Sequence, residues 1–307
     1  MKGLRITVVG SSNIDLLARV PRFPTVGETL VGHSFHIGFG GKGANQAVMA
    51  ALLGAHVTMI TKLGRDVFGQ MTLHNYQQQG IDTEHVLFDE QRASGVAPIW
   101  VDETGRNQIV IVPGANLGLS VDEVRAARRA IQTADVLLCQ LEIPVPTMQE
   151  ALRIAREAGV RTLFNPAPAL PIPDVLLELS DIVCPNETEA ALLTGLPVST
   201  DAQAEQAARR LQHRGAGTVV LTRGERGALI VEGSGPAVDV PGTAVQAVDT
   251  AGAGDAFLGS LATFLAEGKD LVGAVRWANE VAGESVTRMG TQVSFPRREQ
   301  VAYRLTA

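Results

Sequence analysis

Residues 249–256 read Asp249-Thr-Ala-Gly-Ala-Gly-Asp255-Ala256, between the apolar run 245–248 and the helix-compatible stretch 256–265. The backbone N–H groups at the start of a helix are unpaired, and the aligned peptide dipoles place partial positive charge there. The small residues Gly252, Ala253 and Gly254 let an anion approach these N–H groups closely. The stretch therefore predicts a strand, a phosphate-binding turn and a helix in succession.

Asp255 falls in the first turn of that predicted helix, where the dipole favours an ionised carboxylate. A carboxylate beside a phosphate cradle suits phosphoryl transfer to a hydroxyl, because the protein mainly positions groups, neutralises charge and receives a proton. We therefore expect Asp255 to be the catalytic base and residues 252–254 to form the anion hole. The alternative is that Asp255 only caps the helix and that the glycines form an ordinary turn.

Outward from this stretch, short apolar runs alternate with helix-compatible segments. The alternation predicts an α/β fold with a mostly parallel central sheet flanked by helices, and strands that are apolar throughout fit a sheet covered on both faces. Ligands of such sheets bind beyond the carboxyl ends of the strands. The predicted strands lie at 6–9, 57–60, 136–139, 162–164, 182–184 and 218–221, and predicted helices include 121–133, 147–158 and 202–214.

Two segments break the alternation. Residues 16–40 predict a loop and an extended strand, and residues 95–112 predict a hairpin around the turn at 102–106. We expect the two segments to pair into a small projecting sheet, a lid that excludes water from phosphoryl transfer. Residues 1–307 then form a single α/β domain with this lid inserted in it.

Composition excludes several classes of protein. The chain has 307 residues, a net charge of −6 and an ordinary hydrophobic share of 45%. A nucleic-acid binder needs a basic face, which this charge argues against. No apolar run reaches the roughly 18 residues of a membrane helix, so we expect a cytoplasmic protein without a membrane partner. Cys139 and Cys184 end apolar runs and are expected to be buried free thiols, not a disulfide or a metal site.

A second glycine-rich stretch contains a conspicuous lysine, since the chain has only four lysines and 22 arginines. Its glycines allow close backbone approach to a polar ligand, and Lys42 and Asn45 offer donors to hydroxyls. The stretch reads Phe39-Gly-Gly-Lys-Gly-Ala-Asn-Gln-Ala47.

The same stretch has a competing interpretation as a dinucleotide-binding loop, because Gly38-x-Gly40-x-x-Gly43 formally matches that fingerprint. The preceding segment belongs to the predicted lid, however, and the expected acidic position after residues 57–60 holds Thr61 and Lys62. The sequence also lacks the phosphate loop Gly-x4-Gly-Lys-Ser/Thr. Both observations count against an oxidoreductase and a P-loop enzyme.

Three weaker motifs have both a functional and a plain structural interpretation. Asn13 and Asp15, expected to end the first strand, suit a grip on vicinal hydroxyls but also ordinary turn chemistry. Asn186 and Glu189 form either a helix capping box or a site where Glu189 holds magnesium through water. The glycine-rich loop 222–227 joins two predicted strands and also fits a plain hairpin.

Together, these motifs resemble those of the ribokinase-like (phosphofructokinase-B-type) carbohydrate kinases over essentially the whole chain. The matching motifs are Gly10-Ser-Ser-Asn-Ile-Asp15, Phe23-Pro-Thr-Val-Gly-Glu-Thr29, Phe39–Ala47, Asn165-Pro-Ala-Pro168, Pro185-Asn-Glu-Thr-Glu-Ala190 and Val248–Asp255.

The resemblance implies ATP-dependent phosphorylation of D-ribose at O5, with Asp255 as the base, Mg²⁺ accompanying ATP, and a homodimer whose lid sheets clasp each other. By this resemblance, sugar contacts fall on Asn13, Asp15, Gly41, Lys42, Asn45, Glu142 and Asp255. Nucleotide contacts fall on Asn186, Thr222, Gly224, Gly227, Gly254 and Asn279.

A monovalent cation site is also expected beside the anion cradle. The loop 285–294 ends a long helix-compatible stretch, and the free carbonyl oxygens of a helix end are hard ligands for a large cation when a carboxylate supplies charge. The residues alone favour the plainer interpretation that Asp249 caps its turn. The resemblance implies potassium, held mostly through backbone carbonyls by Asp249, Ala251, Ser285, Arg288, Gly290 and Ser294. Met289 and Thr291 depart from the residues expected in that loop.

Alternatives to a ribose kinase remain open at this stage. One is a kinase for deoxyribose, a nucleoside or a keto-sugar, because sugar preference depends on how lid and pocket fit the ligand. Another is a non-catalytic sugar sensor. The intact Asp255 and its anion cradle argue against a sensor, which has no need of a base.

Overall fold

The structure, a computed structural model, describes residues 3–302 and 304–305. Its centre is a nine-stranded sheet with the order β13-β12-β11-β10-β9-β8-β1-β4-β5. Every neighbouring pair from β5 to β11 is parallel, and β12 and β13 complete one edge in antiparallel fashion. The strands are β1 (Arg5–Val9), β4 (His56–Gly64), β5 (Val86–Asp89), β8 (Val136–Gln140), β9 (Arg161–Asn165), β10 (Ile182–Val183), β11 (Thr218–Thr222), β12 (Ala228–Glu232) and β13 (Val238–Val240).

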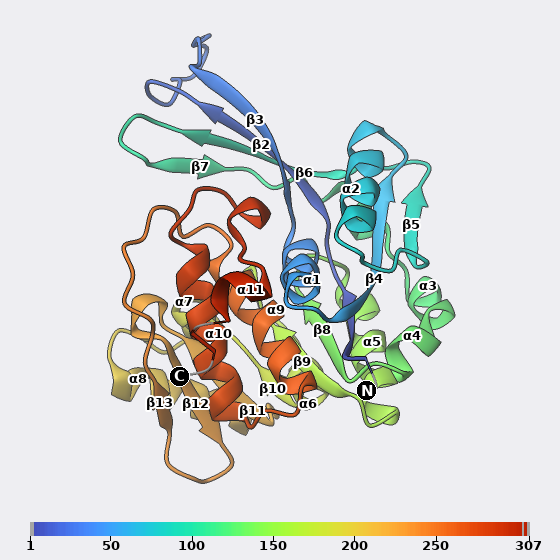
Figure 1. The fold of residues 1–307 in the computed structure, drawn as a ribbon, viewed down its shortest axis with the longest axis vertical. Helices are drawn as coiled ribbons and strands as arrows, with labels where there is room; N and C mark the ends of the chain where they lie inside the picture. Colours follow the sequence, from blue (N-terminus) through green and yellow to red (C-terminus); the bar gives the residue numbers. More distant parts are fainter. Residues whose placement is uncertain (1–2, 303, 306–307) are drawn as a thin grey trace.

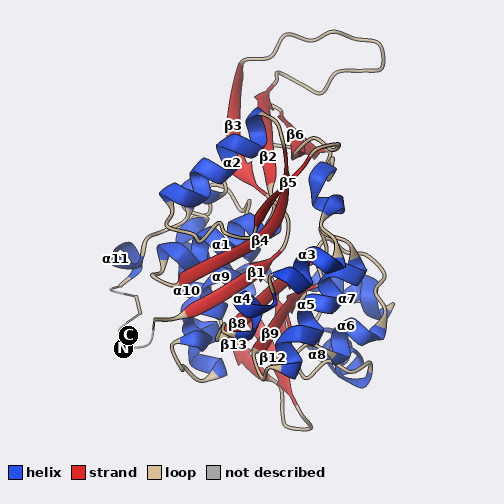
Figure 2. Ribbon diagram, turned by 90° about the vertical axis from the view of Figure 1, so that its right-hand side faces the viewer, coloured by secondary structure: helices blue, strands red, loops and turns tan. Residues whose placement is uncertain are grey.

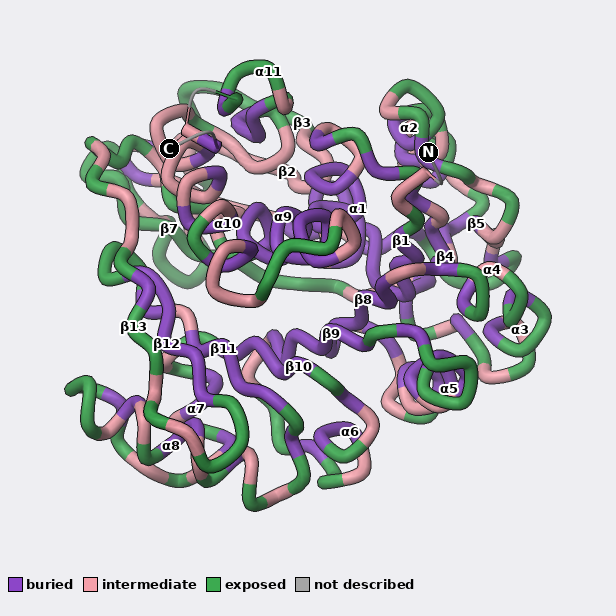
Figure 3. The backbone as a smooth tube through the Cα atoms, turned by 60° about the horizontal axis from the view of Figure 1, so that its bottom comes forward, coloured by how far each residue is buried: buried purple, intermediate pink, exposed green. Residues whose placement is uncertain are grey.

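Helices cover both faces of this sheet, so the molecule has three layers (Figure 3). One face carries α1 (Lys42–Leu52), α9 (Ala253–Ala266) and α10 (Leu271–Ser285). The other carries α3 (Val121–Ala126), α4 (Arg128–Gln132), α5 (Val145–Glu157), α6 (Asp174–Glu178), α7 (Glu187–Thr194) and α8 (Asp201–His213). Each face has its own buried apolar cluster, which accounts for the uninterrupted apolar strands. The predicted fold class is confirmed.

The smaller elements are α2 (Val67–Gln78), α11 (Arg298–Val301) and the 3-10 turns η1 (Gly114–Gly118), η2 (Gly224–Arg226) and η3 (Gln292–Ser294). Among the described residues the longest helices, α9 and α10, have 14 and 15 residues. A bilayer core requires about 20. None of the described helices is therefore long and apolar enough to cross a membrane.

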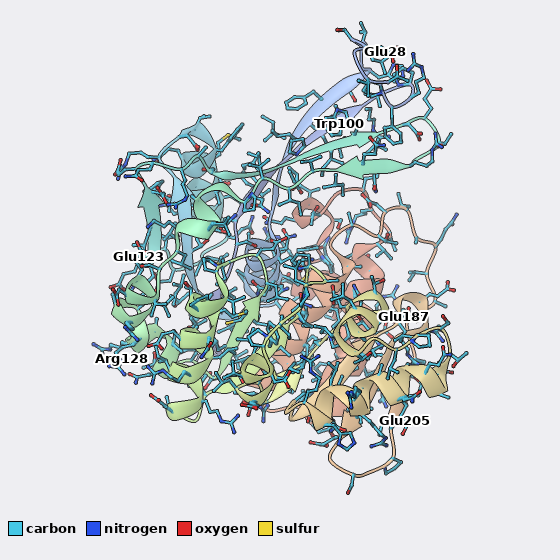
Figure 4. All side chains as sticks on the ribbon, turned by 180° about the vertical axis from the view of Figure 1, so that it is seen from behind. Glu28, Trp100, Glu123, Arg128, Glu187 and Glu205 are labelled. Atoms are coloured by element: carbon cyan, nitrogen blue, oxygen red, sulfur yellow. The ribbon has the colours of Figure 1, made fainter. Side chains whose placement is uncertain are left out.

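The two segments outside the alternation form a second sheet with the order β3-β2-β6-β7, as predicted. It consists of β2 (Asn13–Arg19), β3 (Ser34–Gly40), β6 (Gly95–Val101) and β7 (Asn107–Ile109). Figures 1 and 2 show it projecting from the three-layered body. Figure 4 labels Trp100 within this sheet and Glu28 in the loop at its far tip. We call this sheet and its loops the lid.

The position of Asn13 and Asp15 differs from the prediction. The first strand ends at Val9, and both residues belong to β2 at the base of the lid. After the end of this strand, the backbone at Gly10 passes very close to α1, since a Cβ there would lie 2.9 Å from the Cα of Gly43. The two side chains are therefore fixed on a paired strand, not on a turn.

Some predicted element boundaries were also wrong. The helix expected over 121–133 is two helices, α3 and α4, because the backbone at Ala127 reaches ψ 7° and interrupts the hydrogen-bond ladder. Both short helices pack on α5, a tertiary contact that periodicity does not reveal. The extended strand expected within residues 16–40 spans Ser34–Gly40. The helix α9 begins at Ala253, so Asp255 lies in its first turn, as predicted.

Candidate active site

A cavity of about 180 Å³ opens beyond the carboxyl ends of the parallel strands. Its lining joins the turn 252–254 and Asp255 to Lys42, Asn186, Glu189 and Thr222. Two larger hollows, of about 570 and 690 Å³, lie at the amino ends of the strands, at Arg161 and at Arg5 and His56. We assign the site to the smaller cavity, because ligands of open α/β sheets bind at the carboxyl ends.

Asp255 lies in the first turn of α9 and is only 8% exposed. Both of its carboxylate oxygens accept a hydrogen bond from α1: Oδ2 from Asn45 Nδ2 and Oδ1 from Gln46 Nε2, each at 2.9 Å. Gly252 precedes the helix with φ 77°, a conformation that favours glycine. The predicted pairing of a small-residue turn with a fixed carboxylate is therefore present.

The start of α1 lies beside this carboxylate and is itself capped by Glu142. The Oε2 atom of Glu142 accepts from the backbone N–H of Lys42 at 3.1 Å and from the Ser11 hydroxyl at 2.5 Å. Gly41 precedes the helix with φ 88°, and a Cβ there would lie 2.7 Å from the backbone nitrogen of Asn13. Only glycine fits this junction, which brings the predicted sugar-binding residues of the lid base and α1 together.

Asn13 and Asp15 stand where the lid meets the body. Asn13 is 4% exposed, and its Oδ1 accepts a hydrogen bond from Asn116 Nδ2 at 2.8 Å. Asp15 pairs in register with Gly38 on β3 and Ala97 on β6. A Cβ at Gly40 would lie 2.3 Å from Asp15 Oδ1, so the glycine leaves room for this carboxylate.

Burial dominates the ionisation of the acids. It raises the pKa of Asp255, against the opposing charge of Lys42 and the amides of Asn45 and Gln46. Burial and then the charge of Glu142 raise the pKa of Asp15 to about 6, against a hydrogen bond from Thr291. The helix start alone therefore does not determine the ionisation of Asp255, because the loss of hydration on burial favours its neutral form.

Two charged groups complete this environment. Burial lowers the pKa of Lys42, but the charges of Asp255, Glu142 and Glu189 outweigh it, so that the pKa of Lys42 lies above its usual value. Burial raises the pKa of Glu189, opposed by the backbone N–H of Asn186 and by Lys42. Lys42 is thus a persistent cation facing three acids.

Asn186 and Glu189 form the capping box of α7. Asn186 Oδ1 accepts from the Glu189 backbone N–H at 2.9 Å, and the Glu189 carboxylate accepts from the Asn186 backbone N–H at 2.8 Å. The structural interpretation is correct for this pair, and the cavity-facing position of both residues leaves the ligand role compatible with it. Among the described residues no group of three His, Cys, Asp or Glu side chains could hold a metal ion.

The remaining predicted nucleotide contacts lie next to one another, and Thr222 among them lines the cavity. Thr222 bridges to Asn186, and its loop turns at Gly224 and Gly227, with φ 57° and 83°. A Cβ at Gly227 would lie 2.2 Å from the Val240 carbonyl oxygen, which also accepts from Asn279 Nδ2 at 3.2 Å. The loop joins β11 to the antiparallel β12, so it is the expected hairpin as well.

The proposed cation residues are only partly joined by hydrogen bonds. Asp249 accepts from the backbone N–H of Ala251 through Oδ1 and of Gly290 through Oδ2, both at 2.9 Å. Ser285 and Ser294 instead donate to neighbouring carbonyls, and Arg288 lies 3.6 Å from Glu284. The carboxylate thus joins the turn before α9 to the loop after α10, as both the cation and the capping interpretations require.

Comparison with known proteins agrees with this geometry. The family of pfkB carbohydrate kinases matches residues 4–298. The chain belongs to this family.

Relatives of this kinase are similar over nearly their whole length. The ribokinase of Mus musculus is 45% identical over 300 residues, covering 96% of this chain and 93% of that protein. The deoxyribokinase of Salmonella typhi is 41% identical over 296 residues, covering 96% of each. The structure of Arabidopsis thaliana ribokinase complexed with ribose and ATP is 30% identical, with a TM-score of 0.93 and 99% of both chains covered.

Residues that the sequence did not single out also support the site of this kinase. Gln46 was quoted only as part of a motif, although it contacts Asp255 as closely as Asn45 does. Asn116 lies about a hundred residues from Asn13, so no local pattern connects them. Thr291, noted only as a departure from the family, donates to Asp15. The first two act through long-range contacts, so no local sequence pattern could have found them.

Proposed function

We propose that this kinase transfers the γ-phosphoryl group of ATP to O5 of D-ribose. The observation that supports the proposal best is a buried carboxylate, Asp255, held on both oxygens by α1 at the start of α9. The sugar hydroxyls bind Asn13, Asp15, Gly41, Lys42, Asn45 and Glu142. Full-length similarity to a ribokinase at 45% identity supports ribose as the substrate.

In this mechanism Asp255 takes the proton of the 5-hydroxyl as O5 attacks the γ-phosphorus. The bond between that phosphorus and the β,γ-bridging oxygen breaks, and ADP leaves with the bridging oxygen. The backbone N–H groups of Gly252, Ala253 and Gly254 face the negative charge that develops on the transferred group. Lys42, which lines the same cavity, adds a fixed positive charge.

The nucleotide lies along Asn186, Thr222, Gly224, Gly227 and Asn279. A divalent metal, in our proposal Mg²⁺, neutralises phosphate charge when ATP binds. Carboxylates, Glu189 among them, would hold it through water, since the described residues contain no dedicated cage of side chains. Asp249 and the loop 285–294 would hold potassium, and the bound ion would order the turn before α9.

Residues 1–307 act as one kinase domain whose lid also forms the subunit contact. Phe35, Ile37, Ile109 and Ile111 of the lid are 46–59% exposed, and a partner lid in a homodimer would cover them. A cytoplasmic location, where ATP is available and thiols stay reduced, suits the two buried free cysteines.

The test is ATP-coupled turnover with D-ribose, 2-deoxyribose, fructose and nucleosides, and identification of the phosphorylated hydroxyl by NMR. We expect the highest kcat/KM for ribose and a phosphate on O5. The second candidate is a deoxyribose kinase, favoured by the 41% identity to a deoxyribokinase. A higher kcat/KM for 2-deoxyribose would select it.

The role of Asp255 has its own test. Removing a general base typically lowers the rate by about 10²–10⁴-fold. Asp255→Asn should therefore lower kcat by several orders of magnitude while sugar and ATP binding persist. A variant that keeps a third of the turnover would refute the role of Asp255 as base.

A further inference from the structure

Gln46 is fully buried and does not line the cavity, yet it contacts the proposed base. It therefore cannot act by touching the sugar or the nucleotide there. Packing explains why it meets Asp255. Asp255 and Gly259 are one turn apart on α9, and a Cβ at Gly259 would lie 2.5 Å from the Gln46 carbonyl oxygen. The absence of that Cβ lets α1 and α9 approach until the Gln46 side chain reaches the carboxylate.

The orientation of the Gln46 amide is fixed by a chain of buried amides. Asn165 Nδ2 donates to the backbone carbonyl of Cys184 at 2.9 Å, which turns Asn165 Oδ1 towards Gln46 Nε2 at 3.4 Å. Gln140 Nε2 donates to Gln46 Oε1 at 2.7 Å. Because a backbone carbonyl can only accept, the direction of every bond in the chain follows from Cys184.

A flipped Gln46 amide would place its oxygen against both the Asp255 carboxylate and the Asn165 oxygen. The chain thus excludes the orientation that would repel the base. This arrangement leaves one group unsatisfied at the Gln140 end of the chain of amides. Gln140 Oε1 is buried with no hydrogen-bond partner among the described residues. An unpaired buried oxygen is unfavourable by itself, which indicates that the orientation of Gln140 serves its other neighbour.

We propose that Gln46, oriented by Gln140 and Asn165, is a positioning residue that holds the Asp255 carboxylate ionised and correctly turned for proton transfer. This inference rests on the proposed role of Asp255 as base. Gln46 occupies Oδ1 and Asn45 occupies Oδ2, so the two amides together determine which lone pairs remain for the sugar hydroxyl. Asn45 is also a proposed sugar contact, whereas Gln46 acts only through Asp255.

The ionisation of Asp255 depends on all the groups around it. Lys42 and the two amides of α1 favour the carboxylate, whereas Glu142 after β8, Glu189 on α7 and Asp15 on β2 add negative charge nearby. Since burial already favours the neutral form of Asp255, the loss of either amide donor should shift its ionisation further towards that form. A hydrogen bond to a charged group contributes a factor of about ten to a hundred to such an equilibrium. Its loss should move the ionisation by about one to two pH units.

The experiment measures kcat against pH at saturating ribose and ATP. The acid limb of this profile, the low-pH range in which kcat falls, then reports the ionisation of the base in the ternary complex and not sugar binding. Gln46→Met keeps the size of the side chain and removes its donors. We expect the acid limb to move upward by about one to two pH units. At pH values below the limb, kcat should therefore fall about ten- to a hundredfold, and both KM values should stay within about twofold. Met49→Leu, one turn along α1 in the same interface, is the control and should leave the acid limb in place.

Gln140→Met is the second variant, and it decides the matter if Gln46→Met fails to fold. It removes the orienting bond and the unpaired oxygen together, so it should fold normally and shift the acid limb in the same direction by less. An unchanged acid limb in the folded variants overturns the inference. Asp255→Asn, measured in parallel, tests the underlying function separately: high activity there would refute the base, while an inactive Asp255→Asn with a wild-type Gln46→Met would refute only the role of Gln46.

Discussion

Asn116 Nδ2 donates a hydrogen bond to Asn13 Oδ1 at 2.8 Å, across 103 positions of sequence. The same amide also binds the backbone of Ser12, through Oδ1 to its N–H at 2.8 Å and through Nδ2 to its carbonyl at 3.1 Å. Gly95 makes the contact possible, since a Cβ there would lie 2.1 Å from Asn13 Oδ1. One buried side chain after the lid hairpin therefore fixes the strand that carries the proposed sugar contacts.

Asn116→Ala should weaken sugar binding with little effect on ATP binding. Leaving a buried polar atom unpaired costs about 1–3 kcal/mol, and we expect the ribose KM to rise about tenfold or more. Steady-state kinetics with each substrate varied in turn would measure this. Asn107→Ala, on the exposed β7 of the lid, is the control and should behave like the wild type. A normal ribose KM in Asn116→Ala would show that Asn13 is held without it.

Ribose affinity should fall as the pH drops through about 6, because the pKa of Asp15 is raised to about 6 and its neutral form accepts hydroxyl hydrogen bonds less well. The stability of the free protein changes with pH in the opposite direction. A carboxyl whose folded pKa is raised makes the free protein less stable as pH rises from about 4 to 6. Calorimetric titration with ribose from pH 5 to 8 would test the first effect. Asp15→Asn should bind more weakly at neutral pH and lose this pH dependence. If the wild type bound ribose with equal affinity at pH 5 and 7.5, the predicted role of the Asp15 carboxylate would be contradicted.

Turnover should rise several-fold when sodium is replaced by potassium at constant ionic strength, if the loop around Asp249 holds the cation. Asp249→Ala should abolish the response, because the carboxylate supplies the charge and joins residues 251 and 290. Asp122→Ala, a nearly fully exposed carboxylate on α3, is the control and should keep it. Equal rates in potassium, sodium and a bulky organic cation would refute the proposed potassium site.

The lid should hold two copies of the chain together at micromolar concentration. Ile37→Glu places a charge among the exposed apolar residues of the lid, and analytical ultracentrifugation should then show a monomer. Val238→Glu changes a similarly exposed valine on β13, at the far edge of the central sheet, and should remain a dimer. A monomeric wild type would refute the lid contact.

The sequence by itself determined the features that depend on local chemistry. Alternating apolar runs and helical segments were enough for the three-layered fold, because each segment must bury its own apolar surface. The turn 249–256 and the glycine-rich stretch 39–47 indicated Asp255, Lys42 and Asn45, because anion binding and close backbone approach require small residues next to the functional side chain. Asn13 and Asp15 were likewise singled out as candidates, although the strand on which they lie was not predicted.

Only the tertiary structure decided how these groups act. Gln46 and Asn116 contribute through contacts 209 and 103 positions away, and neither has a local pattern that marks it. Burial raises the pKa of Asp255, a contribution that the predicted helix start could not reveal. Desolvation and buried hydrogen bonds arise only when distant segments pack together. The pKa values of site residues are therefore determined by the tertiary structure and not by the local sequence.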